Sequence, residues 1–149
     1  MKPIEACTSA LKNGPKKETR DIACQDPYCA YWYAQNIDKC PRKDTRKATY
    51  RELYFTYLYA LNIDKGPRKD TRKAVCQDAQ CAYLYAKNVD KCPREDTRKA
   101  ACKNPCYTYF YVKDVDKNFH KDTYNAVQGT KYEEEYKKLI NNGIKEKII

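Results

Sequence analysis

The sequence predicts an all-α protein: a right-handed α-solenoid of about four to five 26-residue helical hairpins with a C-terminal capping helix. Two observations lead to this prediction. The segment Asn36–Lys47 recurs 26 residues later with one change, and again another 26 residues on with two changes. Such a period is typical of repeat proteins, in which each unit buries its apolar face against its neighbours. Within a unit, the apolar residues follow the spacing of a helix.

The first helix of each unit is predicted from the segment that starts at Asp26-Pro27. Aspartate is a favoured N-cap, and proline is favoured at the first helical position. The apolar residues that follow fall at i, i+3, i+4 and i+7 of one helical face: Ala30, Tyr33, Ala34 and Ile37. The helix is expected to stop near Asp38, because Pro41 cannot continue it. All positions from 30 to 34 are apolar or aromatic, which predicts a helix buried between layers.

A second, shorter helix is predicted after the proline, with Asp44 as its cap and good helix formers behind it. The competing interpretation is a strand over Ala30–Ala34, since aromatic residues favour sheets and the period lies within the range of leucine-rich repeats. The leucine pattern of those repeats is absent, however. The segment Thr45–Phe55 also contains no turn residue. Paired helices are therefore favoured.

At this period the chain divides into a repeat array over 1–128 and a capping helix over 129–149. The units are expected at about 1–21, 22–47, 48–73, 74–99 and 100–128. The first of them is degenerate and is recognised by Gly14–Arg20, which matches Cys40–Arg46. Thr130 and Glu133 have the spacing of a capping box, and Asn141-Asn142-Gly143 is the predicted stop of the last helix.

The composition limits the classes of function that the protein is expected to have. Thirty Lys and Arg against twenty Asp and Glu give a formal net charge of +10, which favours an anionic partner such as nucleic acid or an acidic protein. No apolar run reaches the roughly 18 residues of a membrane span. The N-terminus also lacks the apolar core of a signal peptide. We therefore expect a cytoplasmic, monomeric protein that does not enter a membrane.

Nothing in the sequence has the pattern of a catalytic or metal site. The nine cysteines are odd in number, and three of their aligned positions hold Tyr50, Phe55 and Gly66 in the second full unit, which favours packing over zinc or disulfides. His120 is the single histidine, and there is no Gly-rich phosphate loop or Ser/His/Asp spacing. The expectation is a protein that is no enzyme, with no cofactor, metal or small-molecule substrate.

The candidate binding residues are basic and aromatic columns, a column being the aligned positions of successive units. They are Arg42, Arg68 and Arg94; Arg46, Arg72 and Arg98; Lys47, Lys73 and Lys99; and Tyr31, Tyr57 and Tyr83. Stacked units would turn each basic column into a stripe. The alternative is a structural ion-pair ladder, because a carboxylate such as Asp38 opposes the dipole at a helix C-terminus and needs an arginine. Tyr31 and Tyr33 cannot share a helical face, so one tyrosine column is expected inside and the other exposed.

The repeat reads Ala-Tyr-x-Tyr-Ala-x-x-(Ile/Val)-Asp-Lys-x-Pro-Arg-x-Asp-Thr-Arg-x-Ala. It resembles short tandem α-hairpin repeats of bacteriophage and bacterial proteins over residues 22–126, and departs from them at Asn118–Tyr124. The resemblance implies a helical repeat fold and a phage or mobile-element origin in a bacterial host cell. By analogy, it also implies a modulator of host machinery such as an anti-CRISPR inhibitor.

From residues and resemblance together we expect a scaffold that binds an acidic protein through its Arg/Lys stripes and exposed tyrosines. The alternative is direct, sequence-nonspecific binding of RNA or DNA along the same stripes.

Overall fold

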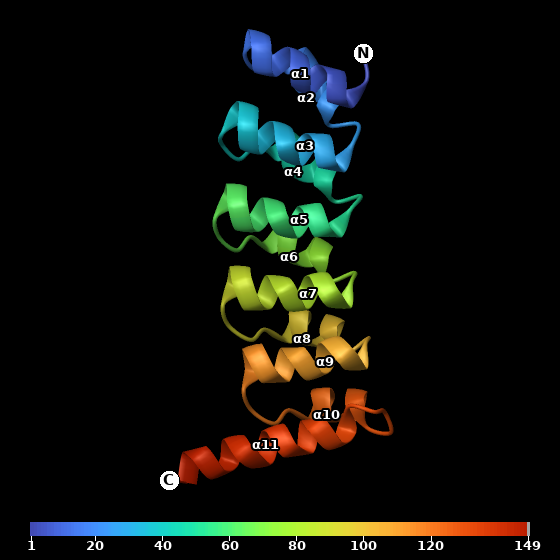
Figure 1. Cartoon of the computed structure of the whole chain (residues 1–149), viewed down its shortest axis with the longest axis vertical. Coiled ribbons are helices and arrows are strands. Elements are labelled where there is room, and N and C mark those ends of the chain that lie inside the picture. The colour runs from blue at the N-terminus through green and yellow to red at the C-terminus, as the bar shows by residue number, and fades with distance from the viewer. Residues whose placement is uncertain (149) are drawn as a thin grey trace. The chain divides into compact units, whose positions relative to one another are not determined.

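A computed structural model describes residues 1–148 and the side chains of residues 1–143. Every regular element in that part of the chain is a helix, and neighbouring helices pair as hairpins (Figure 1). The predicted all-α class is therefore confirmed, and the alternative of a strand over Ala30–Ala34 is wrong. The right-handed sense of the array and the predicted unit boundaries stay predictions. The contacts divide the chain into two units, Met1–Ala74 and Val75–Ile149, each of which is described by itself.

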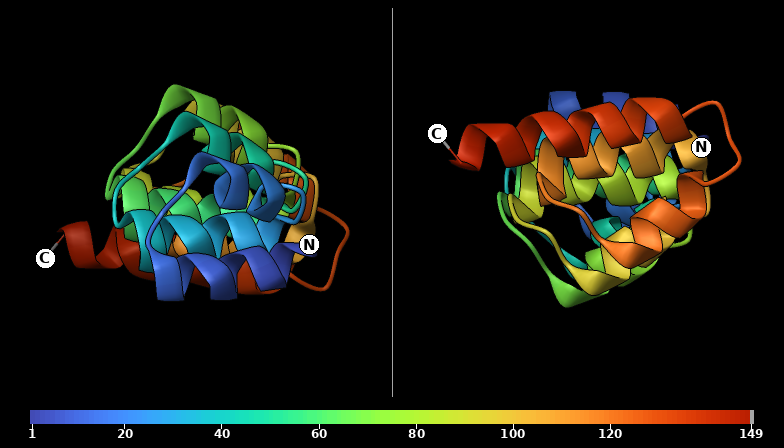
Figure 2. Two further views of the ribbon diagram at one scale, coloured as in Figure 1. Left: turned by 90° about the horizontal axis from the view of Figure 1, so that it is seen from above. Right: turned by 90° about the horizontal axis from the view of Figure 1, so that it is seen from below.

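The first unit consists of two layers. Its elements in chain order are α1 (Pro3–Asn13), α2 (Lys17–Ala23), α3 (Pro27–Tyr33), the π-helical turn η1 (Ala34–Asp38), α4 (Lys43–Thr49), α5 (Leu53–Tyr59), η2 (Ala60–Asp64) and α6 (Lys69–Val75), whose last residue belongs to the second unit. Helices α1, α3 and α5 form one layer, and α2, α4 and α6 form the other (Figure 2, left).

The second unit repeats this arrangement. Its elements are α7 (Ala79–Tyr85), η3 (Ala86–Asp90), α8 (Glu95–Ala101), α9 (Pro105–Tyr111), η4 (Val112–Asp116), α10 (Lys121–Val127) and α11 (Glu133–Ile148). Helices α7, α9 and α11 lie in one layer, and α8 and α10 in the other (Figure 2, right). Among residues 1–148, no helix combines the length and the apolar character that crossing a membrane requires.

The odd-numbered helices begin and end close to where the sequence predicts. The Asp26 carboxylate accepts a hydrogen bond of 2.8 Å from the Cys29 N–H, which confirms Asp26 as the N-cap of α3. The helix continues into η1 and ends after Asp38, where Lys39 adopts a left-handed conformation with φ of 52°. Lys65, Lys91 and Lys117 repeat this conformation. These four turns thus reverse the chain at a lysine, whereas the residue with positive φ after α1 is Gly14.

The start of the short helices differs from the prediction, because Asp44 is not the cap of α4. The helix begins at Lys43, and the Asp44 carboxylate accepts a bond of 2.8 Å from the adjacent Thr45 N–H instead. The start of α4 is held by a tyrosine of the following helix. The Tyr59 hydroxyl accepts a bond of 2.9 Å from the Arg42 N–H and lies 3.1 Å from the Arg42 carbonyl oxygen and 2.9 Å from Thr45 Oγ1.

This contact, the tyrosine staple, recurs along the chain. The hydroxyl groups of Tyr33, Tyr111 and Tyr136 accept from the backbone N–H groups of Lys16, Arg94 and His120 respectively. The rings of Tyr33, Tyr59, Tyr85 and Tyr111 are fully buried, among alanines and threonines that are also fully buried. A tyrosine satisfies both demands of this position, because its ring is large and apolar while its hydroxyl reaches a polar helix end.

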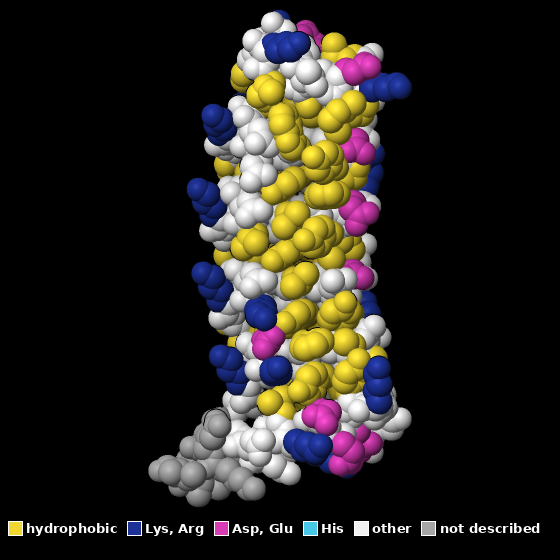
Figure 3. Space-filling model, in the orientation of Figure 1, with side chains coloured by type: hydrophobic (Ala, Val, Ile, Leu, Met, Phe, Trp, Pro, Cys, Tyr) yellow, Lys and Arg dark blue, Asp and Glu magenta, His cyan; other side chains and the backbone are white. Residues whose placement is uncertain are grey.

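The odd-numbered helices are not buried on all sides, so this part of the prediction is wrong. Tyr28 of α3 and Tyr54 of α5 are each 47% exposed, and Trp32 and Leu58 are half-buried. Hydrophobic side chains gather over α3 and α5 on the visible face (Figure 3). The reason is that each unit has only two layers, so one face of every odd-numbered helix has no helix packed on it.

Helix α11 begins at Glu133, and its start departs from the predicted capping box. Thr130 Oγ1 accepts from the Tyr132 N–H at 3.2 Å, and the Glu133 carboxylate accepts from the Gly129 N–H at 3.0 Å. The predicted stop at Asn141-Asn142-Gly143 is wrong, because the helix runs to Ile148. One glycine inside a helix costs only about 1 kcal/mol, which the helix formers after it offset.

Candidate electrostatic binding surface

The column of Arg46 forms a buried ion-pair ladder between successive hairpins. Arg46 Nε donates to Asp64 Oδ2 at 2.9 Å, and the two side chains are only 8% and 4% exposed. Arg20 and Asp38 form the same pair, as do Arg98 and Asp116. Arg46 also lies over the Tyr59 ring, with its guanidinium carbon 5.5 Å from the ring centroid.

The ladder corrects the sequence prediction for this column. Hydrogen bonding to the Asp64 carboxylate raises the pKa of Arg46, and the Arg98 pKa is raised by Asp116 in the same way. Arg46 and Arg98 are therefore internal structural groups rather than an exposed stripe. Arg72 and Arg98 are both half-buried, whereas Arg46 is buried. The alternative of a structural ion-pair ladder therefore holds for this column. Its physical reason is that a carboxylate at a helix C-terminus opposes the helix dipole and is stabilised by a cation beside it.

The column of Arg42, Arg68 and Arg94 is exposed, as predicted. Arg42 Nε lies 3.4 Å from Asp38 Oδ2, and Arg94 Nε lies 3.4 Å from Asp90 Oδ1. Arg68 instead points to Asp70, with Nε donating to Oδ1 at 3.0 Å. These three arginine side chains are 46–47% exposed. Each therefore has an aspartate neighbour and still presents about half of its surface to a partner.

The lysine column is also exposed and lies on the short helices, with Lys47 on α4, Lys73 on α6 and Lys99 on α8. Lys99 Nζ lies 2.7 Å from the Glu95 carboxylate, which raises the Lys99 pKa.

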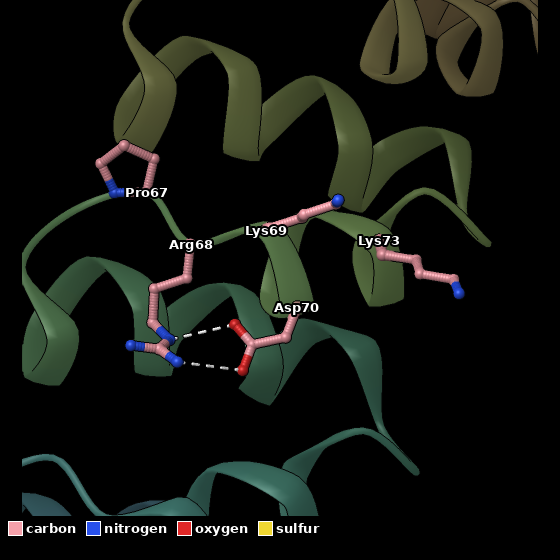
Figure 4. Close-up of a pocket in the computed structure, with 5 residues that line it drawn as sticks. All are labelled: Pro67, Arg68, Lys69, Asp70 and Lys73. Atoms are coloured by element: carbon pink, nitrogen blue, oxygen red, sulfur yellow. Dashed lines mark hydrogen bonds and ion pairs between the residues drawn. The ribbon is translucent and has the colours of Figure 1, made fainter.

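Part of the lysine and arginine columns converges on a surface hollow of about 640 Å³ in the first unit, at the start of α6. Its lining residues are Pro67, Arg68, Lys69, Asp70 and Lys73. Arg68 and Asp70 point toward each other, while Lys69 and Lys73 extend outward (Figure 4). Partial burial of Asp70 opposes its ionisation, but hydrogen bonds from Arg68 and from the Thr71 N–H outweigh this and lower the Asp70 pKa. Three cations therefore stand against one carboxylate.

The second unit has the corresponding hollow at the start of α8, of about 500 Å³, with a different charge balance. It is lined by Pro93, Arg94, Glu95, Asp96 and Lys99, so two cations face two carboxylates. The difference arises at one position, where Lys69 is replaced by Glu95. Lys69 is not among the binding residues predicted from the sequence, although its replacement by Glu95 is visible when the repeats are aligned.

The tyrosine column predicted to be exposed is largely buried. Tyr57 and Tyr83 are only 6% and 8% exposed, so the prediction is wrong for both. Tyr31 is half-buried, and its hydroxyl accepts a bond of 2.9 Å from Asn62 Nδ2 of the next hairpin. Burial, and then the Asp114 carboxylate that its hydroxyl contacts, raise the pKa of Tyr83. This column links neighbouring hairpins, and the exposed tyrosines are Tyr28 and Tyr54.

The cysteines differ in accessibility, and this gives a testable prediction. Burial raises the pKa of Cys29 to about 12, whereas Cys40 and Cys92 are exposed in the turns. Because the thiolate is the reactive species, iodoacetamide at pH 8 is expected to modify Cys40 and Cys92 well before Cys29. Peptide mass spectrometry after short labelling measures the order, and labelling in urea is the control in which Cys29 should react too. Early modification of Cys29 in the folded protein would contradict the structure.

Among the described residues, no three His, Cys, Asp or Glu side chains are grouped so as to hold a metal ion. The comparisons with known proteins add no relative, since no protein-family model, no curated protein and no solved structure matches the chain.

Proposed function

We propose that this protein is a non-enzymatic helical-repeat scaffold that binds an acidic protein through the exposed cations of its turns and short helices. The hollow of Pro67–Lys73 is the observation that carries the proposal. Arg68, Lys69 and Lys73 line one concave surface there, and only Asp70 opposes them. An acidic side chain entering the hollow would meet three positive charges that only one carboxylate offsets.

The buried ladder supports this role. Because Arg46 and its equivalents neutralise the carboxylates at the helix ends, the basic side chains outside the ladder add to the net charge of the surface. Such exposed charges contribute mainly to the rate and the selectivity of association, and less to the stability of the fold. The exposed aromatic residues of the first unit, Tyr28 and Tyr54, lie on the odd-numbered helices, in the other layer from the hollow. The attraction that this hollow offers to a partner is therefore electrostatic.

Nucleic acid is the second candidate, because the same exposed cations would contact phosphates. Counterion release makes such binding steeply dependent on salt, with affinity falling as roughly the 0.7–0.9 power of salt concentration per phosphate contacted. Binding to a 20-nucleotide oligo(U) RNA and to an octaglutamate peptide, each measured by fluorescence anisotropy between 50 and 200 mM salt, separates the two candidates. Preferential binding of the peptide supports the proposal, and preferential binding of the RNA replaces it with the second candidate.

The charge difference between the two hollows gives a reciprocal test. Lys69→Glu is expected to weaken octaglutamate binding by about 3- to 10-fold, since it reverses one exposed charge of the hollow. Glu95→Lys is expected to strengthen binding by a similar factor, because it gives the second hollow the charges of the first. Both side chains are exposed, so neither change should alter the circular dichroism spectrum. Glu95→Lys also removes the exposed pair with Lys99, so its thermal midpoint is expected to fall slightly.

Lys12→Glu on α1 is the matched control, since it makes the same charge change outside both hollows and should have the smaller effect. Equal effects of Lys12→Glu and Lys69→Glu would show that net charge, and not the hollow, governs binding.

A further inference from the structure

The odd-numbered helices of the first unit carry an exposed aromatic face. It is made of Ile4 and Leu11 on α1, Tyr28 and Trp32 on α3, and Tyr54 and Leu58 on α5. Ile4, Leu11, Tyr28 and Tyr54 are 47–63% exposed. Exposed apolar surface that is continuous over several helices and bordered by charges is characteristic of interaction sites.

A ring fills the boundary between α3 and α5. Phe55, the third residue of α5, packs against Tyr28 and Tyr31 with ring centroids 5.6 and 5.9 Å apart. The boundary between α7 and α9 in the second unit is filled in the same way. Tyr107, the third residue of α9, lies 6.2 Å from the Tyr83 ring. Each unit thus has one boundary between consecutive odd-numbered helices that is filled by an aromatic side chain.

The groove between α1 and α3 lacks this ring. Cys29 is the third residue of α3, and Cys7 of α1 faces it, with its sulfur 3.7 Å from the Cys29 carbonyl oxygen. Cys29 thus stands where α5 has Phe55, and with the small Cys7 side chain facing it a hollow of about 140 Å³ remains. Its lining is almost wholly apolar: Ile4, Cys7, Thr8, Leu11, Tyr28, Cys29 and Trp32. An apolar cavity of about 150 Å³ accommodates one benzene ring.

The charges at the borders of the aromatic face indicate what kind of partner could place an aromatic ring in this groove. The left-handed lysines Lys39 and Lys65 are exposed at the C-terminal ends of α3–η1 and α5–η2. Carboxylates of Asp26 and Glu52 stand at the opposite, N-terminal ends. Basic side chains follow one edge of the apolar face, and the acidic side chains lie along the other edge together with some basic ones (Figure 3). Packed helices lie about 8–10 Å apart, which equals about five to seven residues of a helix laid across them.

We propose that the aromatic face of the first unit binds an amphipathic α-helix of a partner protein, with one aromatic side chain of that helix in the α1/α3 groove. The apolar stripe of the partner helix lies on Trp32, Tyr28 and Leu58. Its acidic flank faces Lys39 and Lys65, and its basic flank faces Asp26 and Glu52. The α1/α3 groove lies in a different layer from the hollow of Pro67–Lys73 and shares no lining residue with it.

Trp32 provides the measurement, because it lines the groove and is the one tryptophan of the chain. The probe is a 21-residue helical peptide with leucines in a heptad stripe, one central phenylalanine, glutamates on one flank and lysines on the other. Saturable change of the Trp32 emission is expected with the unmodified protein. Replacing the peptide phenylalanine with alanine should weaken binding by about 10-fold or more, as for a ring that anchors an interface.

A substitution that fills the groove with a side chain of the protein itself is the most direct test. Cys29→Phe places a ring where Phe55 has one, so the peptide should bind about 10-fold more weakly or not at all. Cys40→Phe is the matched control, because it makes the same substitution at an exposed turn position and should leave binding unchanged. Circular dichroism establishes that both variants fold. Leu11→Glu is a second variant, which tests the site if Cys29→Phe does not fold. The Leu11 side chain is 63% exposed, so this change should weaken peptide binding without altering the core.

Three results would overturn the proposal. They are an unchanged Trp32 emission up to millimolar peptide, equal binding of the peptide that lacks phenylalanine, and full binding by both Cys29→Phe and Leu11→Glu. A Trp32 response of the same size to octaglutamate or to oligo(U) would overturn it too, because neither of these probes carries an apolar stripe.

Discussion

Replacing Arg46 with methionine is expected to lower the free energy of unfolding by about 3–5 kcal/mol. The expectation follows from burial, since the Asp64 carboxylate is 4% exposed and would lose the guanidinium that donates to both of its oxygens. A buried carboxylate without a partner pays its desolvation cost with nothing to offset it. Urea denaturation followed by circular dichroism at 222 nm measures the change.

Two companion variants make this result specific. Arg42→Met removes an arginine that is 46% exposed and is expected to cost less than about 1 kcal/mol. The double variant Arg46→Met/Asp64→Leu should recover a large part of the loss, because replacing both partners of a buried pair removes the unpaired charge. An Arg46→Met protein as stable as the parent would mean that the ladder does not hold the hairpins together.

Replacing Tyr59 with phenylalanine is expected to cost about 1–3 kcal/mol, although the ring and its packing remain. The lost hydroxyl accepts from the Arg42 N–H and bonds to Thr45 Oγ1, and both groups lie where water does not replace it easily. The N–H at the start of α4 would be left without its acceptor, which is the main part of the penalty.

Tyr54→Phe is the matched control on the same helix. Its side chain is 47% exposed, so loss of its hydroxyl should change the unfolding free energy by less than about 0.5 kcal/mol. Amide hydrogen exchange adds a local measurement, because Tyr59→Phe should speed exchange at the first turn of α4 more than elsewhere. Equal stability of the two variants would contradict the staple.

Much of the fold was predictable from the spacing of residues. The repeated segment Asn36–Lys47 gave the hairpin period, and Asp26-Pro27 gave the start of the first helix, because capping is a local interaction that the sequence alone specifies. The Arg/Asp repetition also indicated an ion-pair ladder as one alternative. Whether Arg46 or Arg42 belonged to that ladder was not predictable, since both lie within one short segment and only the packing of α4 against the next hairpin separates them.

The tyrosines show most clearly which features could not be predicted from the sequence. Helical spacing places Tyr31 and Tyr33 on different faces, but it does not say which face meets the neighbouring hairpin. Tyr136 was missed as the last member of the staple because it follows Tyr111 by 25 residues and falls out of the 26-residue register. In the structure its hydroxyl nonetheless lies 2.9 Å from Thr123 Oγ1, as the Tyr59 hydroxyl does from Thr45 Oγ1.

The candidate sites were less predictable than the fold. The exposed arginine and lysine columns could be identified from charge, but the hollow of Pro67–Lys73 depends on how the turn and α6 approach each other. No sequence pattern predicts the groove between α1 and α3. It arises from two small side chains, Cys7 and Cys29, which are 22 residues apart and come into contact only when the helices pack.

By itself, the sequence determined that this protein is a series of helical hairpins with basic turns, because period, caps and proline positions act through neighbouring residues. The tertiary structure decided which arginines are buried, which tyrosine column forms the core and where apolar surface stays uncovered. These properties depend on the contacts between one hairpin and the next. Whether a side chain is buried depends on how two neighbouring hairpins pack. The repeated sequence specifies the residues on both hairpins but not which of their faces come into contact.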